Sequence, residues 1–231
     1  NDCIQMATGE FIGFLDCDDV LAPNALEEVV RELNKNKELD FIYSDEDKLT
    51  EDGKKRHDPF FKPDWSPDTF LSLMYTCHFS VYRKKIVDEI GGLTVGLDGA
   101  QDYDFTLRFV SKTNKIAHIS KILYHWRERP ESIASDPEAK PYALEAIKNL
   151  KERYLKENNL KGKVEFESSV YQYRIVYEDS KHSKVSIIIL SKDHPEVLKT
   201  CISSIRQKTK YENYEIIVID NGSNKTNKEK Y

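Results

Sequence analysis

Cysteine is scarce in this sequence of 231 residues, and the cysteines present are not arranged in pairs. Cys3, Cys17, Cys77 and Cys201 lie far apart, and no CxxC motif occurs. This spacing argues against a disulfide framework. Because no signal peptide opens the sequence, we expect a reduced, cytoplasmic setting.

Long apolar runs and an excess of basic charge are also missing. The longest apolar run, near residues 185–190, is far shorter than the ~20 residues of a membrane helix, so we expect at most peripheral contact with the inner face of a membrane. The 35 basic residues are spread along the chain and the net charge is -5, which predicts no nucleic-acid binding. A hydrophobic content of 39% suffices for one good-sized core or two small domains.

The most informative stretch is FIGFLDCDD, in which a mostly apolar run at 11–15 is followed directly by Asp16, Asp18 and Asp19. The pattern predicts a buried strand that ends in acid, where open α/β sheets collect their ligands. Crowded carboxylates need a compensating cation, and an all-oxygen ligand set favours Mg²⁺ or Mn²⁺. The alternative is a solvated turn, because aspartate is common in turns.

Two further acidic segments follow. The short strand at 40–44 runs into Asp45, Glu46 and Asp47, so two strand ends are expected to face one crevice, with Asp45 as a cofactor contact. Later, Asp102 falls at the opening of a helix, after a glycine-rich loop. An ionised carboxylate fixed at a helix N-terminus suits a general base, although an ordinary helix cap has the same pattern.

A basic segment ends the two strands expected at 116–119 and 122–126. There His125 is a candidate metal ligand, and Arg127 or Arg129 could neutralise phosphate. Taken alone, a histidine with flanking arginines on a surface strand is more often simply solvated.

The sequence pattern starts afresh after a polar segment at 178–184, which we interpret as a linker. An apolar strand at 185–190, a helix that begins at Pro195 and a second apolar strand at 214–219 form a βαβ unit with parallel strands. Asp220 ends the second strand and could contact a nucleoside, or it could belong to a simple turn.

Five ordered segments together resemble a known family. FLDCDD resembles the Asp-x-Asp signature of family 2 glycosyltransferases with the GT-A fold. IYSDEDK, FKPDWSP, GAQDYD and YHWR resemble later blocks of the bacterial members that build O-antigen and other surface polysaccharides. The resemblance covers nearly the whole chain and implies an α/β fold: a GT-A (Rossmann-like) mixed, mostly parallel sheet flanked by helices, incomplete at its N-terminus.

The resemblance also implies a mechanism and roles for particular residues. Asp16 and Asp18, with Asp19 nearby, would hold Mg²⁺ or Mn²⁺ and the diphosphate of a UDP- or dTDP-sugar, with His125 as a further contact. Asp102 would deprotonate the hydroxyl of a saccharide or lipid-linked saccharide acceptor in an inverting transfer. Gln101 stands where the wider family commonly has glutamate.

The resemblance divides the chain into two parts. Residues 1–177 correspond to the later portion of a first glycosyltransferase domain, and 185–231 to the start of a second. The second part could dock on the first within one chain or by strand exchange in a dimer, which would make Asp193 and Asp220 nucleotide contacts. The alternative is a tethered, poorly packed unit.

Two other functions stay open. One is a catalytically inert saccharide- or nucleotide-binding module. The other is a nucleotidyltransferase, against which stands the lack of a glycine-rich phosphate loop.

Overall fold

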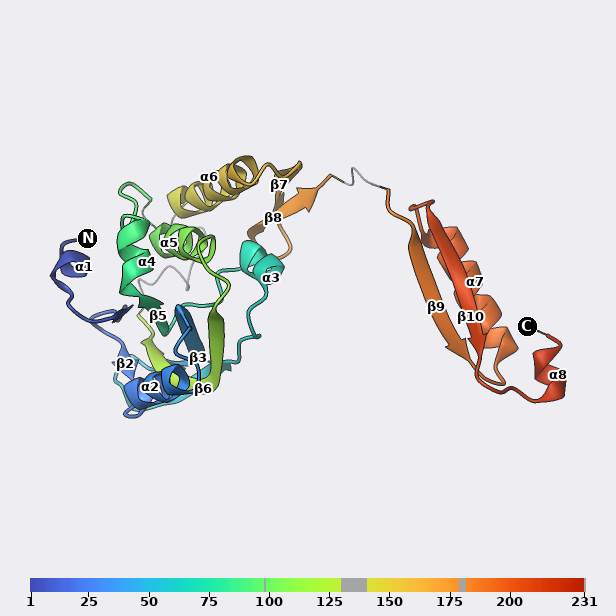
Figure 1. Ribbon diagram of the computed structural model, residues 1–231, viewed down its shortest axis with the longest axis horizontal. Coiled ribbons are helices and arrows are strands. Elements are labelled where there is room, and N and C mark those ends of the chain that lie inside the picture. Colours follow the sequence, from blue (N-terminus) through green and yellow to red (C-terminus); the bar gives the residue numbers. More distant parts are fainter. Residues whose placement is uncertain (98, 130–140, 179–181, 231) are drawn as a thin grey trace. The chain divides into compact units, whose positions relative to one another are not determined.

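The computed structural model describes residues 1–97, 99–129, 141–178 and 182–230. The chain divides into two compact units, Asn1–Tyr177 and Glu178–Tyr231 (Figure 1). The division falls at the start of the expected linker, of which residues 179–181 lie outside the described residues. Each unit is described by itself.

Unit 1 is built on a six-stranded mixed sheet with the order β1-β5-β3-β6-β2, and β4 pairs with β3. The strands are β1 (Phe11–Gly13), β2 (Val20–Leu21), β3 (Phe41–Leu49), β4 (Arg56–Phe60), β5 (Ser80–Arg83) and β6 (Ile116–Arg127). The α/β class is confirmed. The expectation of a mostly parallel sheet is wrong for this unit, because only β3 and β6 pair in parallel among the described strands. A helical crossover lies between β3 and β6, whereas the short turn between β3 and β4 enforces antiparallel pairing.

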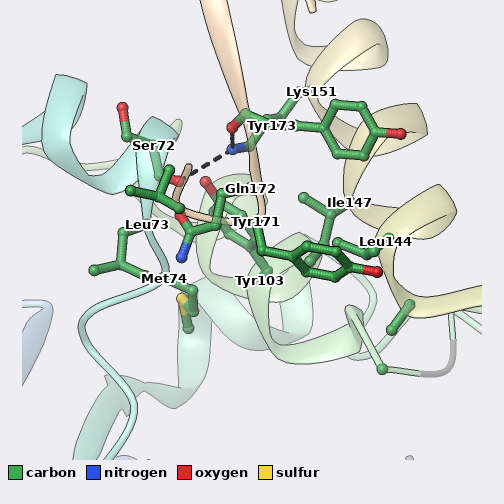
Figure 2. A pocket seen from close by; sticks show the side chains of 13 residues that line it. Ser72, Leu73, Met74, Tyr103, Leu144, Ile147, Lys151, Tyr171, Gln172 and Tyr173 are labelled. Carbon is green, nitrogen blue, oxygen red and sulfur yellow. Dashed lines mark hydrogen bonds between the residues drawn. The ribbon is translucent and has the colours of Figure 1, made fainter. Parts of the chain in front are cut away.

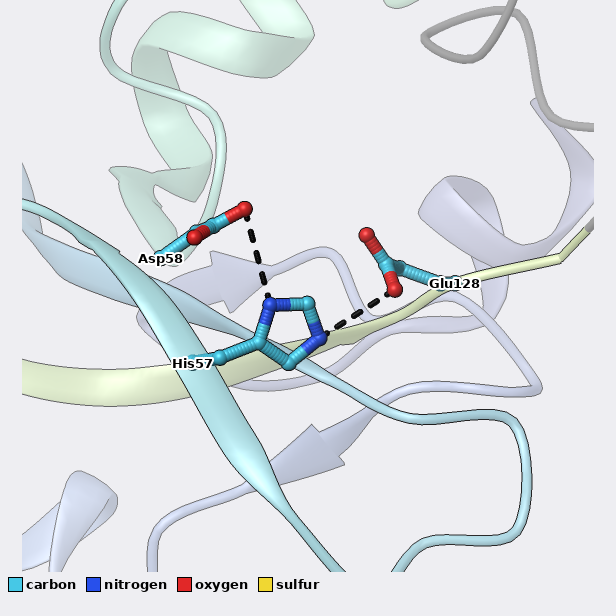
Figure 3. Close-up of side chains that lie close together, drawn as sticks. All are labelled: His57, Asp58 and Glu128. Atoms are coloured by element: carbon cyan, nitrogen blue, oxygen red, sulfur yellow. Dashed lines mark ion pairs between the residues drawn. The ribbon is translucent and has the colours of Figure 1, made fainter.

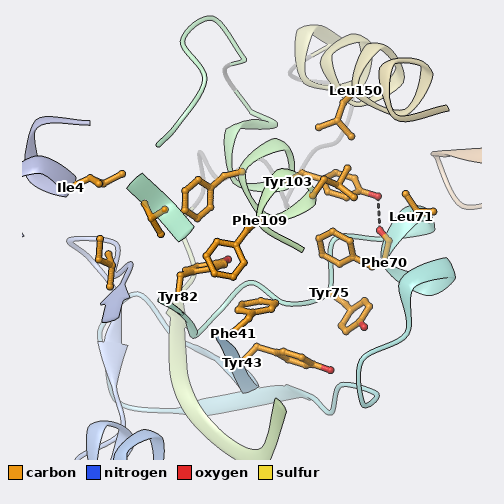
Figure 4. Packing of buried hydrophobic residues seen from close by; sticks show 14 residues of the cluster. Ile4, Phe41, Tyr43, Phe70, Leu71, Tyr75, Tyr82, Tyr103, Phe109 and Leu150 are labelled. Carbon is orange, nitrogen blue, oxygen red and sulfur yellow. Dashed lines mark hydrogen bonds between the residues drawn. The ribbon is translucent and has the colours of Figure 1, made fainter. Parts of the chain in front are cut away.

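Helices pack on both faces of this sheet. They are α1 (Asp2–Met6), α2 (Ala25–Lys35), α3 (Pro67–Ser72), α4 (Lys84–Glu89), α5 (Gln101–Val110) and α6 (Pro141–Glu157). Side chains alternate between the faces of β3, so Phe41 packs in the cluster that includes α5, and Ile42 in the cluster that includes α2. The first cluster is rich in aromatic rings, with Phe41 and Tyr82 stacked at a centroid distance of 4.7 Å (Figure 4). This core fixes the start of α5, which carries Asp102.

Two strand predictions are corrected. The two strands expected near β6 are one, interrupted by a register shift at which Ser44 pairs with Ile119 and Asp45 with Ile122. The strand expected from Cys77 begins only at Ser80. A hairpin of β7 (Gly162–Glu167) and β8 (Gln172–Tyr177) follows α6 and completes unit 1.

Unit 2 is the βαβ unit that the sequence predicts. Strands β9 (Val185–Ser191) and β10 (Tyr214–Asp220) pair in parallel, joined by α7 (Pro195–Lys208) and followed by α8 (Lys225–Lys228). Alternate residues of β9 differ in burial: Ile188 and Leu190 are exposed, whereas their neighbours are partly buried. One face of this strand pair is therefore apolar and uncovered within the described unit. In neither unit is any described helix both long enough and apolar enough to cross a membrane.

Candidate active site

The acidic turn after β1 is fastened to the end of β6. The Asp19 carboxylate accepts hydrogen bonds from the Tyr124 hydroxyl at 2.5 Å and from the Arg127 main-chain N–H at 2.8 Å. Burial raises the pKa of Asp19, and these two hydrogen bonds oppose that rise. Burial, together with Asp19, also raises the pKa of the Tyr124 hydroxyl, which therefore stays a donor. Asp19 thus positions the turn.

Asp16 and Asp18 lie on the outer side of the same turn. Asp16 is exposed, and its carboxylate has no hydrogen bond or ion pair to any residue that the structure describes. Arg129 Nε donates to Asp18 Oδ2 at 2.7 Å and lowers the pKa of that carboxyl. Arg127 Nε donates to the Asp18 main-chain carbonyl at 2.6 Å, so the Arg127 side chain also stabilises the turn. Asp16 is the acid most accessible to a ligand.

A short series of contacts connects this turn with Asp102. Asp102 is exposed at the start of α5, and Cys77 Sγ donates to its Oδ2 at 3.2 Å. Burial raises the pKa of the Cys77 thiol well above its usual value, with Asp102 adding to the effect, so the thiol keeps its proton. The next residue, His78, stacks on the Tyr124 ring at a centroid distance of 4.8 Å. A series of contacts through Cys77, His78 and Tyr124 therefore links Asp102 with the Asp16–Asp19 turn.

An ion pair between Lys62 and Glu46 holds the Cys77–His78 segment in place. Lys62 Nζ lies 3.1 Å from Glu46 Oε2 and donates to the His78 carbonyl at 2.6 Å. Glu46 also accepts from the His78 main-chain N–H. Burial lowers the pKa of Lys62, and Glu46 counteracts this. Lys62 and Glu46 therefore hold His78 through its main-chain carbonyl and its main-chain N–H.

Two of the predicted site residues lie inside the protein. Asp45 is 2% exposed, and its Oδ1 accepts from the Lys62 main-chain N–H at 2.9 Å and pairs with His118 Nε2 at 2.7 Å. It is therefore not open to a ligand, because β3 continues through Asp45 as a buried strand instead of ending before it. His125 is likewise buried, with its Nδ1 2.6 Å from Asp47 Oδ1.

The predicted metal ligands form a partial fit. Asp47 favours the His125 tautomer with the proton on Nδ1, which leaves Nε2 as a potential ligand atom. Among the described residues, no three of Asp16, Asp18, Asp19 and His125 place their ligand atoms within 4.8 Å of one another. Mg²⁺, however, usually needs only one or two carboxylates when a substrate supplies phosphates, and the exposed Asp16 with its neighbour Asp18 satisfies that chemistry.

The group that does converge lies elsewhere: His57, Asp58 and Glu128 approach within 4.8 Å (Figure 3). His57 lies 3.1 Å from Glu128 and 3.5 Å from Asp58. Lys48 Nζ already pairs with both carboxylates, at 3.3 and 3.5 Å. An internal cation therefore already pairs with both carboxylates of this cluster.

In unit 2, the structure places the two predicted nucleotide contacts at the same end of the parallel strands. Asp193 Oδ1 accepts from the Asn224 main-chain N–H at 2.8 Å, and Asp220 Oδ1 accepts from the Ser223 N–H at 2.9 Å. These hydrogen bonds, with one from the Asn227 side chain to Asp193 and one from the Ser223 hydroxyl to Asp220, lower the pKa of both acids. Both are therefore ionised at neutral pH.

Sequence reasoning did not identify four residues that build the site: Cys77, His78, Tyr124 and Lys62. The segment containing Cys77 and His78 has the alternation of an ordinary strand, and Tyr124 was noted only within the YHWR segment. No local signal marks these residues, because their roles depend on contacts between segments that are distant in sequence.

The Tyr124 hydroxyl provides a first test of this architecture. Replacing Tyr124 by phenylalanine leaves half of the Asp19 carboxylate without its donor, so we expect a loss of about 1.5–3 kcal/mol in the free energy of unfolding. Urea titration at pH 7 measures it. Tyr177→Phe, at an exposed tyrosine, is the control and should change stability by less than about 0.5 kcal/mol. Equal stabilities of the two variants would contradict the proposed fastening of the turn.

Comparison with known sequences identifies the family. The profile of Glycosyl transferase family 2 matches residues 1–91 and 186–230, together more than half of the chain. The chain belongs to glycosyl transferase family 2. The two matched segments fall on the two units, one on each.

The chain is also similar to parts of longer proteins. It is 38% identical over 223 residues to the O-antigen biosynthesis protein RfbC of Myxococcus xanthus, which covers 96% of this chain and 17% of RfbC. It is 40% identical over 226 residues to protein y4gI of Sinorhizobium fredii, covering 96% of this chain and 25% of y4gI. Among solved structures, S. aureus TarS 1–349 in complex with UDP-GlcNAc matches with a TM-score of 0.47 and 21% identity, over 65% of this chain and 45% of that TarS 1–349 chain. The family 2 chain thus spans a quarter or less of the length of RfbC and of y4gI.

Proposed function

We propose that this chain is part of an inverting, metal-dependent glycosyltransferase that moves a sugar from a UDP- or dTDP-sugar to a saccharide or lipid-linked saccharide acceptor. Family 2 membership supports sugar transfer, and the similarity to an O-antigen biosynthesis protein supports a role in surface polysaccharide synthesis. The observation that carries the proposal is the contact path from Asp102 through Cys77, His78 and Tyr124 to the acidic turn.

In this proposal, Asp102 is the general base. Its exposed carboxylate accepts a hydrogen bond from Cys77 Sγ on Oδ2, and its Oδ1 accepts from the Tyr103 N–H, so the group is oriented before an acceptor arrives. The acceptor hydroxyl would give its proton to this carboxylate as it attacks the sugar carbon from the face opposite the leaving diphosphate.

Asp16 and Asp18 would hold Mg²⁺ or Mn²⁺ against the donor diphosphate. The bound ion would supply charge neutralisation for the departing nucleoside diphosphate. Asp18 would then hold the ion in place of Arg129, and the Arg129 guanidinium would be available to a phosphate oxygen. Asp19, held by Tyr124 and Arg127, would keep the turn in place.

For unit 2 we propose the start of a second glycosyltransferase domain. Its βαβ order and the family match over residues 186–230 support this. Asp193 and Asp220, adjacent at the end of β9 and β10, would contact the nucleoside of a donor. Docking of this unit on unit 1, in one chain or between two, stays a prediction from the sequence.

Metal-dependent nucleotide binding tests the proposal. We expect UDP or dTDP with Mn²⁺ to raise the melting midpoint of the 231-residue chain, because a ligand at 100 times its Kd stabilises the native state by about 2.7 kcal/mol. Neither nucleotide nor Mn²⁺ alone should produce the full shift, and Asp16→Asn should remove most of it. Asp52→Asn, in an exposed turn of unit 1, is the control and should keep it. An equal shift without metal, or in Asp16→Asn, would refute the metal site.

A further inference from the structure

A cavity of about 290 Å³ lies in unit 1, between the end of α3, the first turn of α5, α6 and the β7–β8 turn (Figure 2). Its walls are mostly apolar, and three of the lining residues are Tyr103, Tyr171 and Tyr173. Drug-sized ligands occupy pockets of roughly 300–1,000 Å³, so this cavity is suited to one sugar ring rather than to an oligosaccharide. Tyrosine rings offer flat apolar faces to the C–H faces of a pyranose.

The cavity is next to the proposed base. Gly99 and Tyr103 line it and flank Asp102 on both sides in the sequence. Met74 also lines the cavity and lies three residues before Cys77, and Cys77 and Asp102 are hydrogen-bonded to each other. The cavity wall therefore includes Tyr103, the residue next to Asp102 in the chain, although Asp102 itself does not line the cavity.

One lining group, Lys151 on α6, carries a charge. It is 1% exposed, and its ammonium donates to the main-chain carbonyls of Ser72, at 3.2 Å, and Tyr173. Its Nζ also lies 5.8 Å from the centre of the Tyr103 ring. Among the described residues, no carboxylate lies within 4.0 Å of this ammonium, and burial lowers its pKa to about 8, so it is mostly charged at neutral pH. Buried charges are normally paired with an opposite charge, and an ammonium has three N–H donors, of which two are used here.

The backbone at Tyr171 is a second sign that this wall is specialised. Tyr171 has a φ of +51°, a conformation that bulky residues rarely adopt. Tyr171 ends the turn between β7 and β8, and its ring packs edge-on against Phe166 while the residue lines the cavity. Strained residues of this kind cluster at ligand sites.

We propose that this cavity binds an acidic sugar unit of the acceptor, with the pyranose ring against the tyrosines and its anionic group, a carboxylate or a phosphate, hydrogen-bonded to Lys151. The inference deepens the proposed function and rests on it. Lys151 then selects acceptors by charge, while Asp102 acts on the reacting hydroxyl. The carboxylate of a uronic acid and the phosphate of a phosphorylated sugar share this chemistry.

Direct binding measurements separate this proposal from the transfer reaction. We titrate the 231-residue chain at pH 7 with D-glucuronate, D-glucose 6-phosphate and D-glucose, and follow ligand resonances by saturation-transfer NMR, without donor or metal. One or both anionic sugars should bind about 10- to 100-fold more tightly than glucose, as a charge-assisted hydrogen bond provides. The stronger of the two identifies the anionic group. Equal binding of all three sugars would overturn the proposal even if the nucleotide test succeeds.

Variants locate the site. Lys151→Met should reduce binding of the anionic sugar to the level of glucose, whereas Lys156→Met, at an exposed lysine of the same helix, should leave it unchanged. Lys151 also donates to two main-chain carbonyls, so its replacement could disturb the fold. A second variant, Leu144→Trp, therefore fills the cavity and keeps the ammonium. Circular dichroism checks that this variant is folded. Leu144→Trp should abolish the binding. Undiminished binding in a folded Lys151→Met or Leu144→Trp protein would assign Lys151 a purely structural role and the sugar another site.

Discussion

Replacing Asp102 by asparagine is expected to lower the rate of Mn²⁺-dependent donor hydrolysis by about 10²- to 10⁴-fold, the usual contribution of a general base. Asparagine has nearly the same shape, and its single oxygen can still accept from the Tyr103 N–H, while its NH2 group faces Cys77 Sγ and donates to the sulfur instead of accepting from it. What is lost is the ability to accept a proton. Release of UDP or dTDP from the sugar nucleotide, measured over time, gives the rate.

The matched control for this experiment is Asp88→Asn. Asp88 is exposed on α4 and pairs with Lys84, outside the site, so its variant should hydrolyse donor at the parent rate. Binding of nucleotide and metal should be the same in the parent and in Asp102→Asn, because Asp102 is not a proposed metal ligand. A variant that loses nucleotide binding together with rate would show that Asp102 holds the donor and is not the base. A parent chain that hydrolyses no donor would instead favour the inert binding module.

The largest expected effect on stability comes from Asp104, two residues further along α5. Its carboxylate is 0% exposed and accepts from Thr94 Oγ1 at 2.6 Å, Arg108 Nε at 2.8 Å and Arg153 on α6. Asp104→Asn removes the negative charge from between two guanidinium groups. Because breaking a buried pair strands its partners, we expect a loss of about 3–5 kcal/mol in the free energy of unfolding. Urea titration of both proteins measures the difference.

The control here is Glu157→Gln, since Glu157 is an exposed partner of the same Arg153 at 3.7 Å. An exposed pair contributes about 0–1 kcal/mol, so this variant should stay close to the parent. If Asp104→Asn were as mild as Glu157→Gln, the buried network would not be what joins α5 and α6.

The same network predicts a pH dependence. Burial disfavours the ionised Asp104, but the hydrogen bonds from Thr94, Arg153 and Arg108 outweigh it, so its pKa in the folded protein is lowered. The unfolded chain then takes up this proton first as the pH falls. The stabilisation by Asp104 is therefore complete above the ordinary pKa of 3.8 and is lost as the pH falls through the lower folded value. The stability difference between parent and Asp104→Asn should accordingly shrink below pH 4.

Local patterns in the sequence were sufficient for much of the fold. The helix at α3 could be placed from Ser66 and Pro67, and the βαβ unit from two apolar runs around a helix that starts at Pro195. The direction of the strands in unit 1 could not be predicted from such patterns. Pairing partners such as β1 and β5 are far apart in sequence, and no local residue encodes their antiparallel pairing. The single strand β6 was divided in two because its register slips where Ile119 gives way to Ile122.

The candidate site shows the same limit. Asp16, Asp18 and Asp102 stand out as acids at element ends, and a pattern can find such residues. Asp45 has the same signature, yet it is buried, because β3 continues past it to Leu49. Tyr124 carries no signature at all. Its importance lies in one hydroxyl that reaches an acid 105 positions earlier, and such a relation exists only after folding.

The uncovered face of β9 and β10 has a practical consequence for work with unit 2. Leu190 is 70% exposed, and Ile188, Ile217 and Ile219 lie open beside it in paired positions on the two strands. Parallel strands are ordinarily sheltered on both faces, and an apolar ribbon with free edges is a template for aggregation. Residues 185–231 produced alone would therefore tend to precipitate as stacked sheets, and a charged substitution at Leu190 is the simplest way to keep that fragment in solution.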